Sequence, residues 1–169
     1  MDTKGKYVRH CNLFIAFSTD YQHKDLAMRI FGRDKLFHGA GFVYTELVNG
    51  KIVIKCHGKS ESLNKGVRRD DDTHILKAMG ADNKNEGIVK AKYMSNGYKG
   101  IVCSEEMEFP QITFGNQSVN AGYVRLIPQE NGTIKIHCFD GEEKISAGVG
   151  PDDHKLIADA LGITDKYEF

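Results

Sequence analysis

Short apolar runs alternate with polar stretches along the chain, and the spacing of apolar positions predicts the elements. The segment 11–17 is almost continuously apolar, which predicts a buried strand. Polar residues that can cap a helix follow it, and the predicted helix stops at Gly32. Two apolar runs then flank an Asn-Gly pair at 49–50, the strongest short-range signal for a β-hairpin. An acidic stretch opens another predicted helix over 71–79.

The same order of elements returns later in the chain. A second Asn-Gly pair lies at 131–132 between two apolar runs, and a helix is predicted over 152–161. Lys6-Tyr7 matches Lys92-Tyr93 at an offset of 86 residues. Six further residues, Gly41, Ile52, Ile54, Cys56, Ile75 and Gly80, return as Gly122, Ile134, Ile136, Cys138, Ile157 and Gly162. Such self-similarity predicts an α+β fold made by tandem duplication of a strand–helix–β-hairpin–helix unit.

The predicted repeats are 1–82 and 83–169, joined by the polar bridge 81–87. Each repeat has too few apolar residues to be secure alone. We therefore expect one compact domain in which the two sheets join around a pseudo-two-fold axis. The duplication also separates structure from function. A residue that the fold needs should occur in both copies, whereas a residue held for function can survive in one.

Composition and charge limit the classes of function. The chain is 40% hydrophobic and 27% charged, which is typical of a globular protein. Its 23 Lys+Arg balance 23 Asp+Glu, so no net field attracts nucleic acid or a membrane surface. No apolar signal-like segment opens the sequence, which predicts a soluble, cytoplasmic protein. Tyr7, Tyr93 and Tyr98 are accordingly interpreted as half-buried residues of a strand edge.

Cysteine and histidine spacing predicts neither a metal site nor a cofactor. No Cys-x-x-Cys pair occurs, and no two histidines have a metal-ligand spacing on one helix. Cys56 and Cys138 end equivalent strands and are interpreted as small buried hydrophobes. His137 and His154 are interpreted as surface groups. The acidic run 70–72 is interpreted as the cap of the following helix.

The two copies differ where chemistry would be located. The first copy has His23 near the start of its short helix, and the second has Glu106 followed closely by Pro110. After the hairpin, the first copy has the hydroxyl-rich loop Gly58–Ser62. The second has acidic residues at 141–144. Backbone amides and hydroxyls can hold an anion, so a phosphate pocket is predicted in the first copy only.

These residues resemble a known family. The segment 21–32, YQHKDLAMRIFG, is similar to the signature helix of phosphohistidine phosphatases of the Janus/Ocnus family. The segments 39–43, GAGFV, and 51–60, KIVIKCHGKS, resemble that family's hairpin. The resemblance covers most of 6–80, and a more degenerate copy of the same pattern covers 92–162. The duplicated arrangement also resembles a group of small uncharacterised proteins of T4-like bacteriophages.

The resemblance implies residue roles in the first copy. His23 would be the general base, and Gly58, Lys59, Ser60 and Ser62 would bind phosphate. The family's hairpin arginine falls on Phe42 here, and its first-strand basic residue has no match within 11–13. The four candidates to replace these cations are Lys24, Lys59, Arg68 and Arg69.

Three functional hypotheses follow. The first is a phage-encoded accessory protein in the host cytoplasm that binds a phosphorylated small molecule or host protein without robust catalysis. The second is a metal-independent phosphohydrolase that uses His23 as general base. The third is a purely structural interaction module that uses the joined sheet or its edge. The sequence identifies neither the ligand nor the oligomeric state.

Overall fold

The computed structural model describes residues 5–32, 37–80, 87–96, 98–107, 120–139, 152–163 and 167–168. Strands make up more of these ranges than helices, and the protein is of the predicted α+β class. The helices are α1 (His23–Phe31), α2 (Asp71–Ala78) and α3 (Asp153–Leu161). The strands are β1 (Gly5–His10), β2 (Leu13–Phe17), β3 (Gly39–Val48), β4 (Lys51–His57), β5 (Lys59–Ser60), β6 (Lys65–Gly66), β7 (Val89–Ser95), β8 (Gly100–Cys103), β9 (Asn120–Pro128), β10 (Ile134–Phe139) and β11 (Tyr167–Glu168).

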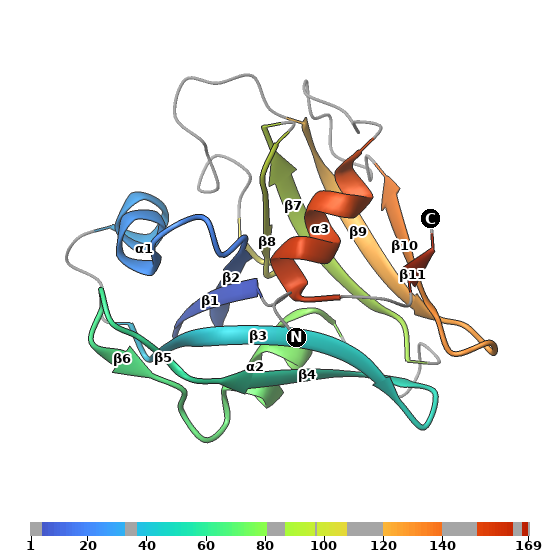
Figure 1. Ribbon diagram of the computed structural model, residues 1–169, viewed down its shortest axis with the longest axis horizontal. Coiled ribbons are helices and arrows are strands. Elements are labelled where there is room, and N and C mark those ends of the chain that lie inside the picture. Colours follow the sequence, from blue (N-terminus) through green and yellow to red (C-terminus); the bar gives the residue numbers. More distant parts are fainter. Residues whose placement is uncertain are drawn as a thin grey trace.

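A large curled sheet organises the described part of the chain (Figure 1). Its nine strands run in the order β11-β10-β9-β7-β8-β2-β1-β3-β4. Neighbouring strands are antiparallel, except that β10 and β11 are parallel. The short strands β5 and β6 form a separate two-stranded ribbon beside β3.

The sheet is continuous across its middle through the pair β2–β8. Ala16 lies opposite Val102, Ile15 opposite Cys103, and Phe17 opposite Ile101. From this pair outward, one side runs β2-β1-β3-β4 and the other β8-β7-β9-β10. Counted outward from the β2–β8 pair, each side therefore begins with its first two strands in reverse chain order, β2-β1 or β8-β7. The two strands of the Asn-Gly hairpin follow, β3-β4 or β9-β10.

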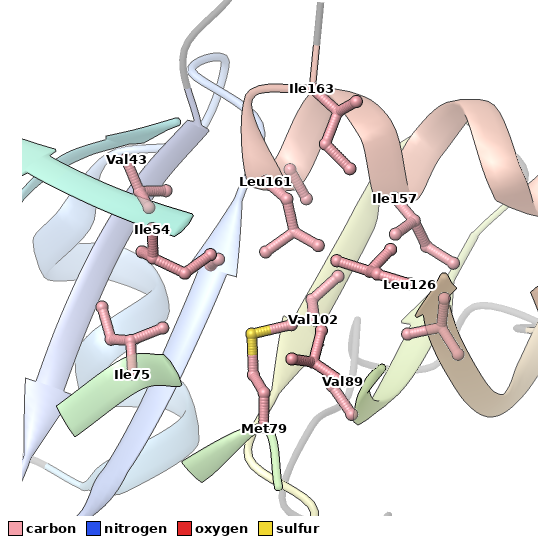
Figure 2. Close-up of a cluster of buried hydrophobic side chains, with 14 of the residues drawn as sticks. Val43, Ile54, Ile75, Met79, Val89, Val102, Leu126, Ile157, Leu161 and Ile163 are labelled. Carbon is pink, nitrogen blue, oxygen red and sulfur yellow. The ribbon is translucent and has the colours of Figure 1, made fainter. Parts of the chain in front are cut away.

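Two hydrophobic layers cover opposite faces of the sheet. Alternate residues of a strand point to opposite faces, and Tyr7 and Val8 of β1 belong to different clusters. One cluster includes Ile75 of α2 and Leu161 of α3, together with residues from both sides of the sheet (Figure 2). The other packs Leu26 and its neighbours in α1 against β1, β2 and β8.

The helix α3 lies across the junction of the two sides, where it contacts β8, β10, β1 and β2 (Figure 1). The Thr45 Oγ1 atom of β3 donates a 2.9 Å hydrogen bond to the Leu161 carbonyl oxygen. A Cβ atom on Gly5 would lie 1.8 Å from the Ala160 carbonyl oxygen. Only glycine therefore lets α3 approach β1 this closely.

Both predicted Asn-Gly hairpins and both helices that follow them are confirmed. At the first turn Asn49 and Gly50 have φ of 54° and 76°, as a type I′ turn requires. The prediction of one strand over 11–17 is wrong for its first two residues. Cys11 and Asn12 form the turn between β1 and β2, and Cys11 has a φ of 55°.

Other predictions differ from the structure in detail. The first helix begins at His23, and its N-cap residue, Gln22, makes no side-chain capping bond. Tyr7 and Tyr93 are fully buried in inner strands instead of lying half-buried at an edge. His154 is buried, which corrects its interpretation as a surface group, whereas His137 is exposed as predicted. Residues 81–86 of the bridge 81–87, Pro110 and the acidic loop 141–144 lie outside the described residues.

Candidate functional site

His23 is buried at the start of α1. The residue is 4% exposed, and its Nε2 atom lies 2.7 Å from the Gly41 carbonyl oxygen. A carbonyl only accepts hydrogen bonds, so the Nε2 atom carries the hydrogen in this contact. In the neutral ring the lone pair therefore lies on Nδ1. The neighbouring strand β3 thus sets the tautomer of the predicted general base.

Two aromatic rings enclose the His23 imidazole. The ring of Phe17 lies 5.7 Å from it and that of Phe42 lies 5.8 Å from it, both edge-on. Burial lowers the pKa of His23 below its ordinary value, although the bond to Gly41 acts in the opposite direction. The ring is consequently neutral at neutral pH, the form in which it could accept a proton.

Lys6 is a cation whose charge acts on this histidine, and the sequence analysis missed it. It lies in β1 opposite Phe17 on one side and Phe42 on the other. Its Nζ atom donates a 2.7 Å hydrogen bond to the Tyr21 carbonyl oxygen. Burial lowers the pKa of Lys6, and its charge further lowers the pKa of His23.

The loop Gly58–Ser62 is attached to the first turn of α1. The Lys24 amide donates a 3.1 Å hydrogen bond to Ser62 Oγ. The Ser60 hydroxyl is buried, accepts a bond from the Leu63 amide and lies 3.4 Å from Ser62 Oγ. The predicted base and the predicted phosphate loop are therefore neighbours. We use "His23 site" for His23, Lys6, Lys24 and the loop 58–62.

The loop bends away from β4 at Gly58, which has a φ of 75°. A Cβ atom there would lie 3.0 Å from the Phe42 ring. That ring also stacks on His57, with centroids 5.8 Å apart. An aromatic side chain thus fills the place where the resemblance puts an arginine.

The four predicted replacement cations are dispersed. Lys24 is exposed at the start of α1, and Lys59 is exposed in β5. Arg68 instead donates through Nε to the His38 carbonyl oxygen at 2.9 Å, and Arg69 is exposed nearby. Of these four residues, Lys24 and Lys59 belong to the His23 site.

A second polar feature, also missed from sequence, lies on the opposite face of β1. The buried carboxylate of Asp71 accepts bonds from the Tyr7 hydroxyl, from Arg9 Nε at 2.7 Å, and from the Arg68 amide at 2.8 Å. The acidic run 70–72 was interpreted as a cap, but Asp71 turns inward instead. Asp70 occupies the N-cap position of α2 without a side-chain capping bond.

The other side of the sheet has a similar arrangement. Tyr93 and Ser95 of β7 donate to the buried Asp153 carboxylate at 2.6 and 2.8 Å. Tyr7 and Tyr93, and Asp71 and Asp153, match at the offsets of the predicted repeats, and this recurrence is the signal by which the sequence could have pointed to the two buried carboxylates.

The half-buried thiols agree with their structural interpretation. Cys56 and Cys138 are the next-to-last residues of β4 and β10 and pack against the core. Burial is the main cause that raises the pKa of each to about 12. Both thiols therefore stay protonated at neutral pH and are poor nucleophiles.

At the position matching the His23 site, the second side has different residues. Glu106 is exposed, and the buried Lys92 donates through Nζ to the Met107 carbonyl oxygen at 2.8 Å. Tyr123 and Phe139 stack with centroids 5.6 Å apart, where the first side stacks Phe42 on His57. The histidine itself has no counterpart there in the sequence.

Comparisons with models of protein families, with curated proteins and with solved structures found no match to this chain. Within the described residues, none of the helices has the length and apolar character needed to cross a membrane.

Proposed function

We propose that this protein binds a phosphorylated ligand at the His23 site without robust catalysis. The observation that carries the proposal is the attachment of the loop 58–62 to the start of α1, next to His23 and Lys6. A lysine ammonium, exposed lysines and a glycine-containing loop are groups that commonly bind phosphate oxygens. The ligand would be a phosphorylated small molecule or a phosphorylated host protein.

Burial of His23 supports binding more than turnover. A general base must reach the attacking water, but this imidazole is 4% exposed and packed between two phenylalanine rings. Phe42 adds no positive charge where phosphoryl transfer would develop negative charge. A site with this composition holds an anion more readily than it stabilises a transition state.

The alternative is a metal-independent phosphohydrolase with His23 as general base. One observation favours it: the bond to the Gly41 carbonyl fixes the tautomer and leaves a lone pair on Nδ1. An orienting bond of this kind is a regular feature of catalytic histidines. Activity would then require an opening of the aromatic enclosure that admits water.

The proposal includes the predicted origin of the fold, a tandem duplication of a phosphohistidine-phosphatase-like unit in a phage accessory protein. The register of β2 and β8 supports the duplication. Ile15 corresponds to Ile101 at an offset of 86 residues, and Phe17 to Cys103. Because Ile15 pairs with Cys103 and Phe17 with Ile101, the pairing has the reciprocity of a two-fold axis through Ala16 and Val102.

Phosphate-dependent melting of matched lysine variants tests the binding proposal. Inorganic phosphate and phosphoramidate should raise the melting temperature of the wild type, because a ligand of the native state stabilises it. Lys6→Met should lose this rise. Lys92→Met should keep it, since Lys92 makes the same type of bond to a backbone carbonyl on the side of the sheet where Glu106 replaces His23.

A phosphate-release assay separates the binding protein from the hydrolase. Under the main proposal, neither the wild type nor His23→Ala releases phosphate from phosphohistidine. Release by the wild type that disappears in His23→Ala would establish the hydrolase instead. No thermal shift and no release would contradict both and leave the third hypothesis, an interaction module.

A further inference from the structure

A cluster of three side chains of metal-binding type shares no residue with the His23 site. It consists of His10, Cys11 and His38. One potential ligand atom from each residue lies within 4.8 Å of the other two. The cluster belongs to the opposite end of β1, where His10 is its last residue. Nothing in the spacing of these residues along the chain reveals it, because His38 comes from a different segment.

The fold brings these residues together through backbone contacts. Cys11 occupies the tight turn between β1 and β2 with a φ of 55°. The His38 amide donates to the Arg9 carbonyl oxygen at 2.8 Å, which places His38 beside that turn. The Cys11 amide in turn donates to His38 Nδ1 at 2.9 Å.

Aromatic packing limits the movement of His10. Its ring lies 5.5 Å from the ring of Phe31 and 6.5 Å from that of Phe37. The rings of His10 and His38 lie 5.9 Å apart. Cys11 is exposed, so an ion in solution can reach its thiol.

We propose that His10, Cys11 and His38 bind a divalent transition metal of the zinc type. Two imidazoles and one thiolate are ligands that Zn²⁺ prefers, and three protein ligands leave one coordination position open. Bond lengths of about 2.0–2.3 Å place tetrahedral ligand atoms about 3.3–3.8 Å apart. Side-chain rotations that shorten the separations by at most about 1.5 Å would therefore complete the site.

The charges near the cluster set the affinity. Arg9 is paired with the buried carboxylate of Asp71, which offsets its charge. The exposed Arg68 guanidinium binds the His38 carbonyl oxygen and would oppose a bound cation. If His38 used Nδ1 as ligand, the metal would replace the Cys11 amide as the partner of that nitrogen.

The second copy has no such ligand set in its sequence. Aligned at the offsets of the repeats, His10 and Cys11 correspond to Asn96 and Gly97, and His38 corresponds to Val119. The cluster is therefore a property of the first copy alone, as expected of residues held for function. The inference stands independently of the phosphate proposal, since the two sites share no residue.

Titration of the reduced, chelator-treated, tag-free full chain with Zn²⁺ tests the site. We expect one equivalent of Zn²⁺ to bind by calorimetry. Loss of a residue that only supports a metal ligand costs about 10–100-fold in metal affinity. Because Cys11 and His38 are proposed as direct ligands, Cys11→Ser and His38→Asn should each weaken binding by at least about tenfold. Cys138→Ser and His137→Asn remove the same side-chain types away from the cluster and should leave the affinity unchanged.

Substitution with Co²⁺ identifies the ligands. A thiolate bound to Co²⁺ gives a near-ultraviolet charge-transfer band, which should appear in the wild type and be absent in Cys11→Ser. Circular dichroism confirms that the variants are folded. The proposal is overturned if binding does not saturate, if Cys11→Ser and His38→Asn bind Zn²⁺ as the wild type does, or if the cobalt complex lacks the thiolate band.

Discussion

The hydroxyl of Tyr7 donates a hydrogen bond to the carboxylate of Asp71, and both side chains are completely buried. The two residues are 64 positions apart in the chain. Their contact fixes the start of α2 against β1, and burial is the main cause that raises the pKa of Tyr7. Arg9 completes the group by pairing with the same carboxylate.

Asp71→Asn should destabilise the protein strongly, because it leaves the Arg9 guanidinium buried without its anion. Breaking one partner of a buried ion pair costs about 3–5 kcal/mol, and we expect a loss of this order in the free energy of unfolding by urea. The double variant Arg9→Met/Asp71→Asn should regain part of that loss. A single-variant cost below about 1 kcal/mol would contradict the structural role.

The stability of the protein should depend on the protonation of His23. Its pKa is lowered in the folded state, mainly by burial, so the unfolded chain binds more protons below the ordinary value of about 6.5. Stability is then fully present above that pH and is lost as the pH falls toward the folded pKa. One such group changes the free energy of unfolding by at most about 1.4 kcal/mol per pH unit.

His23→Gln should therefore flatten the dependence of unfolding free energy on pH between 7.5 and 5.5. Urea unfolding at several pH values measures the slope. His137→Gln provides the control, because His137 is exposed on β10. Equal slopes in the wild type and His23→Gln would contradict this, because they would show that His23 binds protons equally in the folded and the unfolded protein.

Gly5→Ala should disturb the docking of α3. The added Cβ would lie 1.8 Å from the Ala160 carbonyl oxygen, a backbone atom that cannot rotate away. Overpacking of this kind costs about 1–3 kcal/mol, and we expect the upper end of that range in urea unfolding. In Gly66→Ala the nearest atom is 3.7 Å away, and the change should stay within about 0.5 kcal/mol. Equal effects of the two substitutions would contradict the close approach of α3.

Phe42→Arg should increase affinity for phosphate by placing a cation beside His23. Hydrogen bonds to charged groups contribute about 1.5–3 kcal/mol, which corresponds to about 10–100-fold in the dissociation constant. Calorimetric titration with inorganic phosphate measures the gain. Tyr44→Arg places the same charge two residues along β3 and should gain much less. Similar gains in both variants would indicate general attraction instead of a site.

Local signals in the sequence predicted the elements well. The Asn-Gly pairs mark both hairpins, because they supply the positive φ found at Asn49, Gly50 and Gly132. The acidic residues at the starts of 71–79 and 152–161 mark two helix starts. The turn at Cys11 was missed because Cys11 is apolar and adjoins the run, and because the turn contains no glycine or proline. The start of α1 was misplaced since three polar residues precede it and the actual N-cap, Gln22, is a weak signal.

The candidate site was predictable only in part. The resemblance named His23 and the loop 58–62, and the structure brings them together through the Lys24 amide and the Ser62 hydroxyl. Lys6 could not be assigned from the sequence, because its place beside Phe17 and Phe42 depends on the pairing of three strands. Asp71 was misread for the same reason: its partners in β1 are more than 60 residues away.

The position of α3 also has a consequence for biosynthesis. Thr45 of β3 bonds to Leu161 at a separation of 116 residues, and β1 packs on the same helix. On the ribosome, the first strands leave the exit tunnel long before α3 does. The part of their apolar face that α3 covers stays exposed until α3 emerges, because α2 covers only another part of that face. A pause in translation before α3 would prolong this exposure to chaperones and to aggregation.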